Sequence, residues 1–125
     1  NVRPKAPGMK YRHYAPKAPL ILVKGREADV IEKINHLVRE AADRGMKAGI
    51  IGTEETCAEY REGIVKCIGT RRQEETIAQH LYEILREFDD LDVDIIYSES
   101  FSDAGIGQAI MNRMLKAAGH RVLEV

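Results

Sequence analysis

Short apolar segments alternate along this chain with longer segments whose apolar residues recur at helical spacing. Residues 20–23 and 48–51 are continuous apolar runs, which are typical of strands covered on both faces. Further strands are predicted at residues 64–68, 93–97 and 121–125. Because helical segments separate these strands, we expect right-handed crossovers and a mostly parallel sheet.

Three of the intervening segments have one apolar face with the helical repeat. The first face lies within residues 30–42, and Gly45 stands where a C-terminal cap is expected. The other two faces consist of Ile77, Leu81, Ile84, Leu85 and Phe88, and of Ile106, Ala109, Ile110, Met114 and Ala117. A short helix or turn is predicted around residues 54–60. The expected fold is therefore an α/β, Rossmann-like three-layer domain, with about five strands and about four helices on both faces of the sheet.

The first 19 residues differ in composition from the rest of the chain. All four prolines and five of the 19 basic residues lie there, whereas all 20 acidic residues come later. Proline fixes φ and restricts the residue before it, so this segment is predicted to be extended and fairly stiff. We divide the chain into a basic interdomain linker, residues 1–19, and a folded domain, residues 20–125.

The overall composition allows a buried core and excludes several classes of partner. At 44% hydrophobic and 31% charged residues, the chain can bury a core and remain soluble. A net charge of −1 gives no overall attraction to nucleic acid or to an anionic membrane, and no apolar run approaches the ~18 residues that cross a bilayer. Cys57 and Cys67 match neither a redox motif nor a zinc motif. We therefore expect two free thiols and a cytoplasmic location.

One stretch of the linker combines cationic and aromatic side chains: Lys10, Tyr11, Arg12, His13 and Tyr14. The planar guanidinium of Arg12 suits phosphate or carboxylate, and the tyrosines offer flat faces. A stiff strap of this kind suits a lid over a bound nucleoside triphosphate, where it would shield a reactive acyl-adenylate from water. The alternative is that the tyrosines only dock the linker on a neighbouring domain.

A second candidate site, for an anion or a nucleotide, follows the predicted fourth strand. Its residues are Ser98, Ser100, Gly105, Gly107, Asn112 and Arg113. A glycine turn at a helix N-terminus presents free N–H groups to an anion. However, Ile110 occupies the third glycine position of the dinucleotide-binding pattern, so the sequence favours a tight turn and close helix packing instead. Ser102 or Asp103 is predicted to cap the helix, and Arg113 to pair with an acid.

Other clusters of reactive side chains do not indicate chemistry in this chain. The acidic residues between positions 89 and 94 lack the spacing and the glycine of a calcium loop. His36, His80 and His120 are isolated from one another in the sequence. No serine-hydrolase pattern is present. We predict no catalytic residue and no metal site.

Two motifs resemble those of a known enzyme family. Residues 7–16 read PGMKYRHYAP, and residues 105–113 read GIGQAIMNR. They resemble the linker and the last helix of two-domain threonylcarbamoyl-AMP synthases, in which a YrdC-like catalytic domain precedes a Rossmann-like domain. The resemblance implies an enzyme of the nucleotidyltransferase type that condenses L-threonine, bicarbonate and ATP, with magnesium, into threonylcarbamoyl-AMP. A downstream tRNA threonylcarbamoyl transferase then uses this product to modify tRNA.

The resemblance implies that this chain is an accessory domain with a lid-forming linker. Its partners would be its own catalytic domain and, in the intact enzyme, the three substrates. The catalytic domain is absent from these 125 residues, so the chain alone is expected to be inactive, to bind no cofactor and to make no direct contact with nucleic acid. Two alternatives are a free-standing nucleotide-binding module that uses the Gly105 turn, and a protein-interaction or dimerisation domain.

Overall fold

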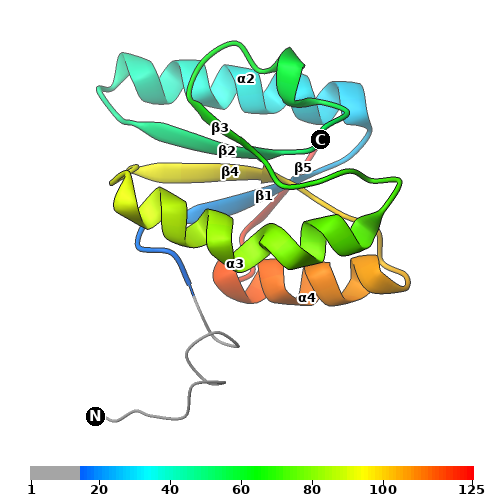
Figure 1. Cartoon of the computed structure of the whole chain (residues 1–125). Helices are drawn as coiled ribbons and strands as arrows, with labels where there is room; N and C mark the ends of the chain where they lie inside the picture. Colours follow the sequence, from blue (N-terminus) through cyan, green and yellow to red (C-terminus); the bar gives the residue numbers. More distant parts are fainter. Residues whose placement is uncertain (1–14) are drawn as a thin grey trace, which may run out of the picture.

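Five parallel strands in the order β3-β2-β4-β1-β5 form the central sheet of the computed structural model, which describes residues 15–125 (Figure 1). The strands are β1 (Leu20–Lys24), β2 (Ala48–Gly52), β3 (Ile64–Cys67), β4 (Ile95–Glu99) and β5 (Val122–Glu124). All strand pairings are parallel. The predicted three-layer α/β fold is confirmed.

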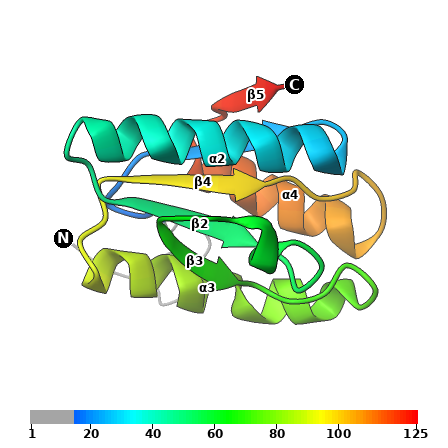
Figure 2. The same ribbon diagram turned by 90° about the horizontal axis from the view of Figure 1, so that it is seen from above.

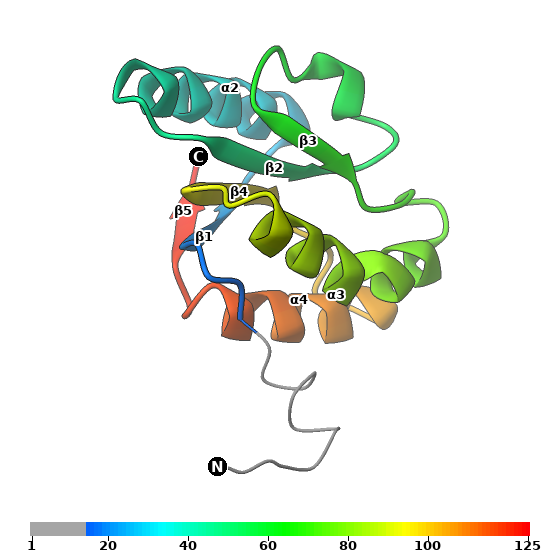
Figure 3. The ribbon, with the colours of Figure 1, turned by 60° about the vertical axis from the view of Figure 1, so that its left-hand side comes forward.

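Helices cover both faces of the sheet. Helix α2 (Glu27–Asp43) lies on one face, and α3 (Glu74–Asp90) and α4 (Ile106–Ala117) lie together on the other (Figure 3). The turn expected around residues 54–60 contains a short 3₁₀-helix, η1 (Cys57–Glu59). The described residues thus contain three α-helices and one 3₁₀-helix, where about four helices were predicted.

The sheet separates two hydrophobic cores. Val30, Ile34 and Val38 of α2 are buried with Ile50 and Tyr97 on one side of the sheet. On the other side, the fully buried Phe88 of α3 packs directly on the backbone of β2, where a Cβ on Gly49 would lie 2.5 Å from its ring. Since any side chain at position 49 would displace this ring, glycine sets the distance between α3 and the sheet.

Two elements differ most from the sequence predictions, while β3 and β5 are only one and two residues shorter than predicted. Strand β4 begins at Ile95 rather than at residue 93, because the Asp94 carboxylate accepts a hydrogen bond from the Lys47 N–H, 2.7 Å, and so holds the chain before the strand. Helix α4 turns Gly107 inward, with Ile110, Met114 and Ala117 at helical spacing from it. Ile106, one residue before Gly107, is 46% exposed, and Ala109 is exposed as well, so their assignment to the buried face is wrong.

The end of the predicted linker packs against the domain. Pro16 and Ala18 are buried, and the Lys17 N–H donates a 2.8 Å hydrogen bond to the Asp89 carboxylate at the end of α3. The carbonyl of Pro19 accepts a hydrogen bond from the Ile96 N–H. The linker is therefore anchored at the amino edge of the sheet, whereas residues 10–14, the proposed strap, lie outside the described residues. No helix within residues 15–125 is long and apolar enough to cross a membrane.

Candidate functional site

The chain reverses its winding direction between β1 and β4, which are neighbours in the sheet. The loop after β1 leads to α2 on one face, and the loop after β4 leads to α4 on the opposite face (Figures 1 and 2). Ligands of open α/β sheets bind in the crevice that such diverging loops leave at the carboxyl ends of the strands. This edge of the sheet is therefore the first place to look for a site.

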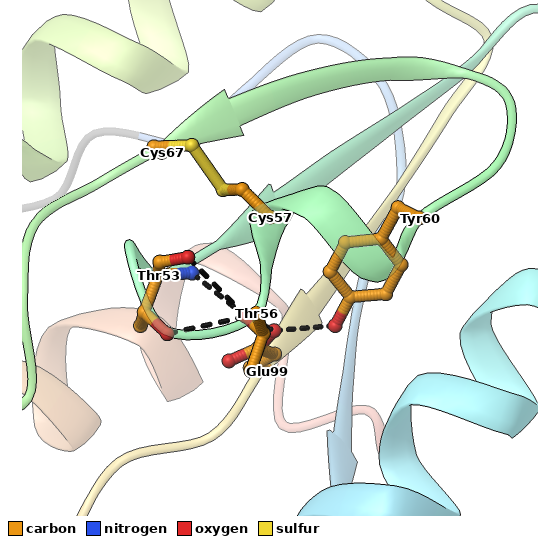
Figure 4. Close-up of a disulfide and its surroundings, with 6 residues drawn as sticks. All are labelled: Thr53, Thr56, Cys57, Tyr60, Cys67 and Glu99. Atoms are coloured by element: carbon orange, nitrogen blue, oxygen red, sulfur yellow. Dashed lines mark hydrogen bonds between the residues drawn. A yellow bond between two sulfur atoms is a disulfide. The ribbon is translucent and has the colours of Figure 1, made fainter.

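Glu99, the last residue of β4, is an acid buried at this edge, with 2% of its surface exposed. The hydroxyls of Thr56 and Tyr60 both donate hydrogen bonds to its Oε2 atom (Figure 4). Arg71 Nη2 donates to Oε1 at 2.9 Å. Charged hydrogen bonds from both sides of the carboxylate offset the free-energy cost of removing it from water.

Tyr60 serves this site as a hydrogen-bond donor. Burial raises the pKa of its phenol, and the hydrogen bond to the negatively charged Glu99 raises that pKa further. The phenol therefore keeps its proton at physiological pH and cannot act as a general base there.

The Arg71 guanidinium lies between Glu99 and the ring of Phe101. Nη2 also donates to the carbonyl of Ser100 at 2.9 Å, and Cζ is 5.0 Å from the centroid of the Phe101 ring, within cation–π range. The Arg71 side chain is 35% exposed, and within residues 15–125 no acceptor is found for its Nε or Nη1 atoms. Arg71 is therefore fixed in orientation while some of its donors remain open to solvent.

A pocket of about 240 Å³ opens beside this pair and is lined by Gly25, Glu27, Val30, Arg71, Glu99 and Ser100. Gly25 permits the close passage of the chain end, since a Cβ there would lie 2.6 Å from the carbonyl oxygen of Val125. Because Arg71 and Glu99 neutralise each other, the exposed Glu27 carboxylate sets the net charge of the lining. The pocket is smaller than the roughly 300–1,000 Å³ of typical ligand sites, so it suits a small polar group better than a nucleotide.

Cys57 and Cys67 form a disulfide, and the prediction of two free thiols is wrong (Figure 4). Their Cα atoms are 6.1 Å apart because η1 folds back beside the carboxyl end of β3, a proximity that sequence spacing does not reveal. Free thiols therefore cannot support the cytoplasmic location. This bond attaches the segment of residues 53–60 to β3. The segment carries both hydroxyl groups that donate to Glu99.

Glu55 joins the same segment to the loop after β3. Its carboxylate accepts hydrogen bonds from the Thr70 hydroxyl, 2.5 Å, and from the Arg71 N–H, 3.1 Å. The Thr70 hydrogen bond is the largest cause that lowers the pKa of Glu55, from 4.5 to about 2. The two loops that position Arg71 and Thr56 are thus fastened to each other.

We expect a ¹³C NMR titration to show the pKa of Glu55 near 2 rather than 4.5. Because folding lowers this pKa, the ionised carboxylate stabilises the fold above pH 4.5, and the contribution is lost as the pH falls toward 2. Thr70→Val removes the donor hydroxyl with little change of shape and should raise the pKa toward its ordinary value. A pKa near 4.5 in the unchanged protein would contradict this arrangement.

The residues of the predicted anion site occupy different environments. Ser100 lines the pocket, whereas Ser98 is fully buried and donates its hydroxyl to the Glu99 carbonyl at 2.8 Å. Asn112 and Arg113 are exposed on α4, and the expected acidic partner of Arg113 is not found within the described part of the chain.

The two glycines of this predicted site have backbone and packing roles. Gly105 caps α4 with φ 60° and ψ −137°, so the prediction that Ser102 or Asp103 caps the helix is wrong. A Cβ on Gly107 would lie 2.1 Å from Ser102 Oγ, which in turn donates to the Glu74 carboxylate at 3.1 Å. This carboxylate lies beside the start of α4 and weighs against an anion there.

Comparison with known proteins links the chain to one family. Residues 1–119 match the family described as "Threonylcarbamoyl-AMP synthase, C-terminal domain". Threonylcarbamoyl-AMP synthase of Bacillus subtilis is 49% identical over 123 residues, which are 98% of this chain and 34% of that protein. The chain thus spans about one third of the length of the curated relatives that it matches.

Two solved structures have the same fold. The crystal structure of Pyrococcus abyssi Sua5 complexed with L-threonine matches with a TM-score of 0.80 and 39% identity, over 96% of this chain and 34% of that chain. A crystal structure of a C-terminal Sua5 domain from Pyrococcus horikoshii matches with a TM-score of 0.71 and 33% identity, over 89% of this chain and 100% of that one.

Proposed function

This chain belongs to the family of threonylcarbamoyl-AMP synthase C-terminal domains, and on this basis we propose that it is the accessory domain of such a synthase. In this proposal its linker forms a lid over the active site of the catalytic domain. The enzyme makes threonylcarbamoyl-AMP from L-threonine, bicarbonate and ATP, for the threonylcarbamoyladenosine modification of tRNA. The family match carries the proposal, because it covers the linker and the domain together, residues 1–119.

The chain does not match the other two thirds of its relatives. We propose that the synthase reaction takes place in that part of the enzyme. There a YrdC-like domain would bind ATP with magnesium, and a tRNA threonylcarbamoyl transferase would consume the product. The Pyrococcus abyssi relative was crystallised with L-threonine, which agrees with the proposed substrate. We propose a cytoplasmic location because these substrates are found there.

The anchored end of the linker supports a lid that moves with the domain. The hydrogen bond from Lys17 to Asp89 and the burial of Pro16 and Ala18 fix the chain immediately after the proposed strap. In the sequence this anchored point directly follows the strap residues Lys10, Tyr11, Arg12, His13 and Tyr14. A change in the orientation of the domain would move the strap on or off the active site.

The anchored end of the linker, residues 16–19, and the Glu99 pocket lie at opposite ends of the sheet. The linker enters at the amino end of β1, and the pocket lies at the carboxyl ends of β1 and β4, a separation of about 16 Å for a five-residue strand. A molecule in the pocket therefore does not touch the point where the strap is attached. The small volume of the pocket and the Glu74 carboxylate beside the Gly105 turn favour the accessory domain over a free-standing nucleotide-binding module.

We expect the isolated 125-residue chain to release no detectable pyrophosphate from ATP in the presence of L-threonine and bicarbonate. The physical reason is that the domain proposed to bring the three substrates together is missing. The full-length synthase, assayed in parallel at the same concentration, serves as the positive control. Turnover by the purified chain that depends on both threonine and bicarbonate would refute the proposed division of labour.

A further inference from the structure

The disulfide lies where an external thiol can reach it. β3 is an edge strand of the sheet, and Cys67 at its carboxyl end is exposed. A pocket of about 170 Å³ opens beside it, lined by Lys66, Cys67, His80, Glu83, Ile84 and Glu87. Since thiol–disulfide exchange requires a thiolate to approach one sulfur, this pocket makes Cys67 Sγ the accessible point of attack.

One of the two sulfur atoms, Cys57 Sγ, lies beside the Glu99 site. A Cβ built on Gly52 would lie 3.0 Å from the Tyr60 ring, 3.2 Å from Cys57 Sγ and 3.4 Å from Glu99 Oε2. The sulfur, the ring and the carboxylate therefore surround one backbone position. Cys57 directly follows Thr56, one of the two hydroxyl donors to Glu99.

A separate contact fixes the far end of the same segment. The buried Asn35 of α2 donates to the Glu59 carbonyl at 3.0 Å and accepts from the Arg61 N–H at 3.1 Å. This clamp does not involve the disulfide. At the near end, the hydrogen bonds of Glu55 with Thr70 and the Arg71 N–H are also independent of it. Opening the disulfide should therefore loosen residues 56–58, between these two anchors, and leave residues 59–61, with Tyr60 among them, in place.

We propose that Cys57 and Cys67 form a reversible thiol–disulfide site that controls the hydrogen bond from Thr56 to Glu99. The thiolate of an external dithiol attacks Cys67 Sγ, the S–S bond breaks, and Cys57 leaves as a thiolate that takes up a proton. The second thiol of the reductant then releases Cys67 as a thiol, so the dithiol becomes a disulfide and two electrons pass to the protein. In the reduced state the Glu99 carboxylate keeps its hydrogen bonds from Tyr60 and Arg71 but loses the hydrogen bond from Thr56.

The proposal rests on the cytoplasmic location proposed above. Disulfides in that compartment are usually catalytic or redox-sensing rather than permanent. Its test uses no synthase activity, so its failure and the failure of the proposed function can be told apart.

The test compares the 125-residue chain in oxidised glutathione with the same sample in millimolar dithiothreitol at pH 7.5. Alkylation followed by mass spectrometry should show no modified cysteine in the first state and two in the second, and removal of the reductant should reverse the change. In ¹H–¹⁵N NMR spectra, the amides of residues 56–58 and of Glu99 should shift on reduction. The amides of Glu59, Arg61 and α4 should stay within the line width.

Two variants separate the chemistry from its structural effect. The double variant Cys57→Ser, Cys67→Ser should give the NMR spectrum of the reduced chain. Its spectrum should not change when dithiothreitol is added. Thr56→Val lacks the hydroxyl that donates to Glu99 in either redox state. It should keep the redox-dependent amide shifts of residues 56–58 but lose most of the redox-dependent shift of the Glu99 amide. Should the serine variant fail to fold, the reductant experiment on the unchanged chain still decides.

Three results would overturn the proposal. The first is thiols that stay free in oxidised glutathione, and the second is a disulfide that opens only in denaturant. The third is reduction that leaves the amides of residues 56–58 and Glu99 where they were.

Discussion

Arg12→Ala in the full-length synthase should lower the rate of threonylcarbamoyl-AMP formation by about ten- to a hundredfold. The estimate corresponds to the loss of a charged hydrogen bond at a site closed to water, about 1.5–3 kcal/mol, if that bond acts in the transition state. Arg12→Lys should restore little of the rate, because a single ammonium cannot replace the planar, bidentate guanidinium. The rate is to be measured as pyrophosphate release at limiting ATP and, separately, at limiting threonine.

Arg3→Ala is the matched control for this prediction, because Arg3 is a basic residue of the same linker outside the PGMKYRHYAP motif. It should leave the rate within about twofold of the unchanged enzyme. Neither substitution should alter the melting temperature of the domain, since both positions precede the first strand in the sequence, in the predicted linker. Full turnover of Arg12→Ala at limiting concentrations of both substrates would make the linker a simple tether.

Glu99→Ala should reduce the free energy of unfolding of this domain by about 3 kcal/mol, which is about 10–15 °C in melting temperature. The substitution leaves the Thr56 and Tyr60 hydroxyls without their acceptor and removes the ionic partner of Arg71. The value is placed at the low end for buried ion pairs because Arg71 is partly exposed to solvent. Thermal and urea unfolding of the isolated chain measure it.

Glu54→Ala offers a comparison within the same segment. Glu54 is exposed, and only its backbone is seen to form a hydrogen bond in the described structure, to the Gly69 carbonyl. Its replacement should change stability by less than about 0.5 kcal/mol. Equal stability losses for Glu99→Ala and Glu54→Ala would show that the buried network does not stabilise the fold.

Most of the fold follows from local pattern. The apolar runs at residues 20–23 and 48–51 are covered by helices on both faces, and the faces of α2 and α3 appear where helical spacing predicts them. The pattern fails at the start of α4, where an apolar residue, Ile106, competes with a glycine for the inward position. Gly107 takes the inward position because only a residue without a side chain fits against Ser102.

The site at the carboxyl edge could not be predicted because its parts are distant in sequence. Glu99 bonds with Thr56, Tyr60 and Arg71, which come from 28 to 43 residues earlier. The sequence Ser98-Glu99-Ser100 suggests a loop, yet β4 carries Glu99 into the buried layer. An acid two residues after the apolar run Ile95-Ile96-Tyr97 is the one local clue, since such a position is buried in a parallel sheet and needs a partner.

The central claim, that this chain completes the active site of a synthase, is tested most directly by pyrophosphate release from the full-length enzyme and from a form ending just before residue 1. With threonine, bicarbonate and ATP all present, we predict that the shortened form is at least tenfold slower, and that a form keeping residues 1–19 but lacking 20–125 is intermediate. Equal rates for the full-length enzyme and the form without residues 1–125 would contradict the claim.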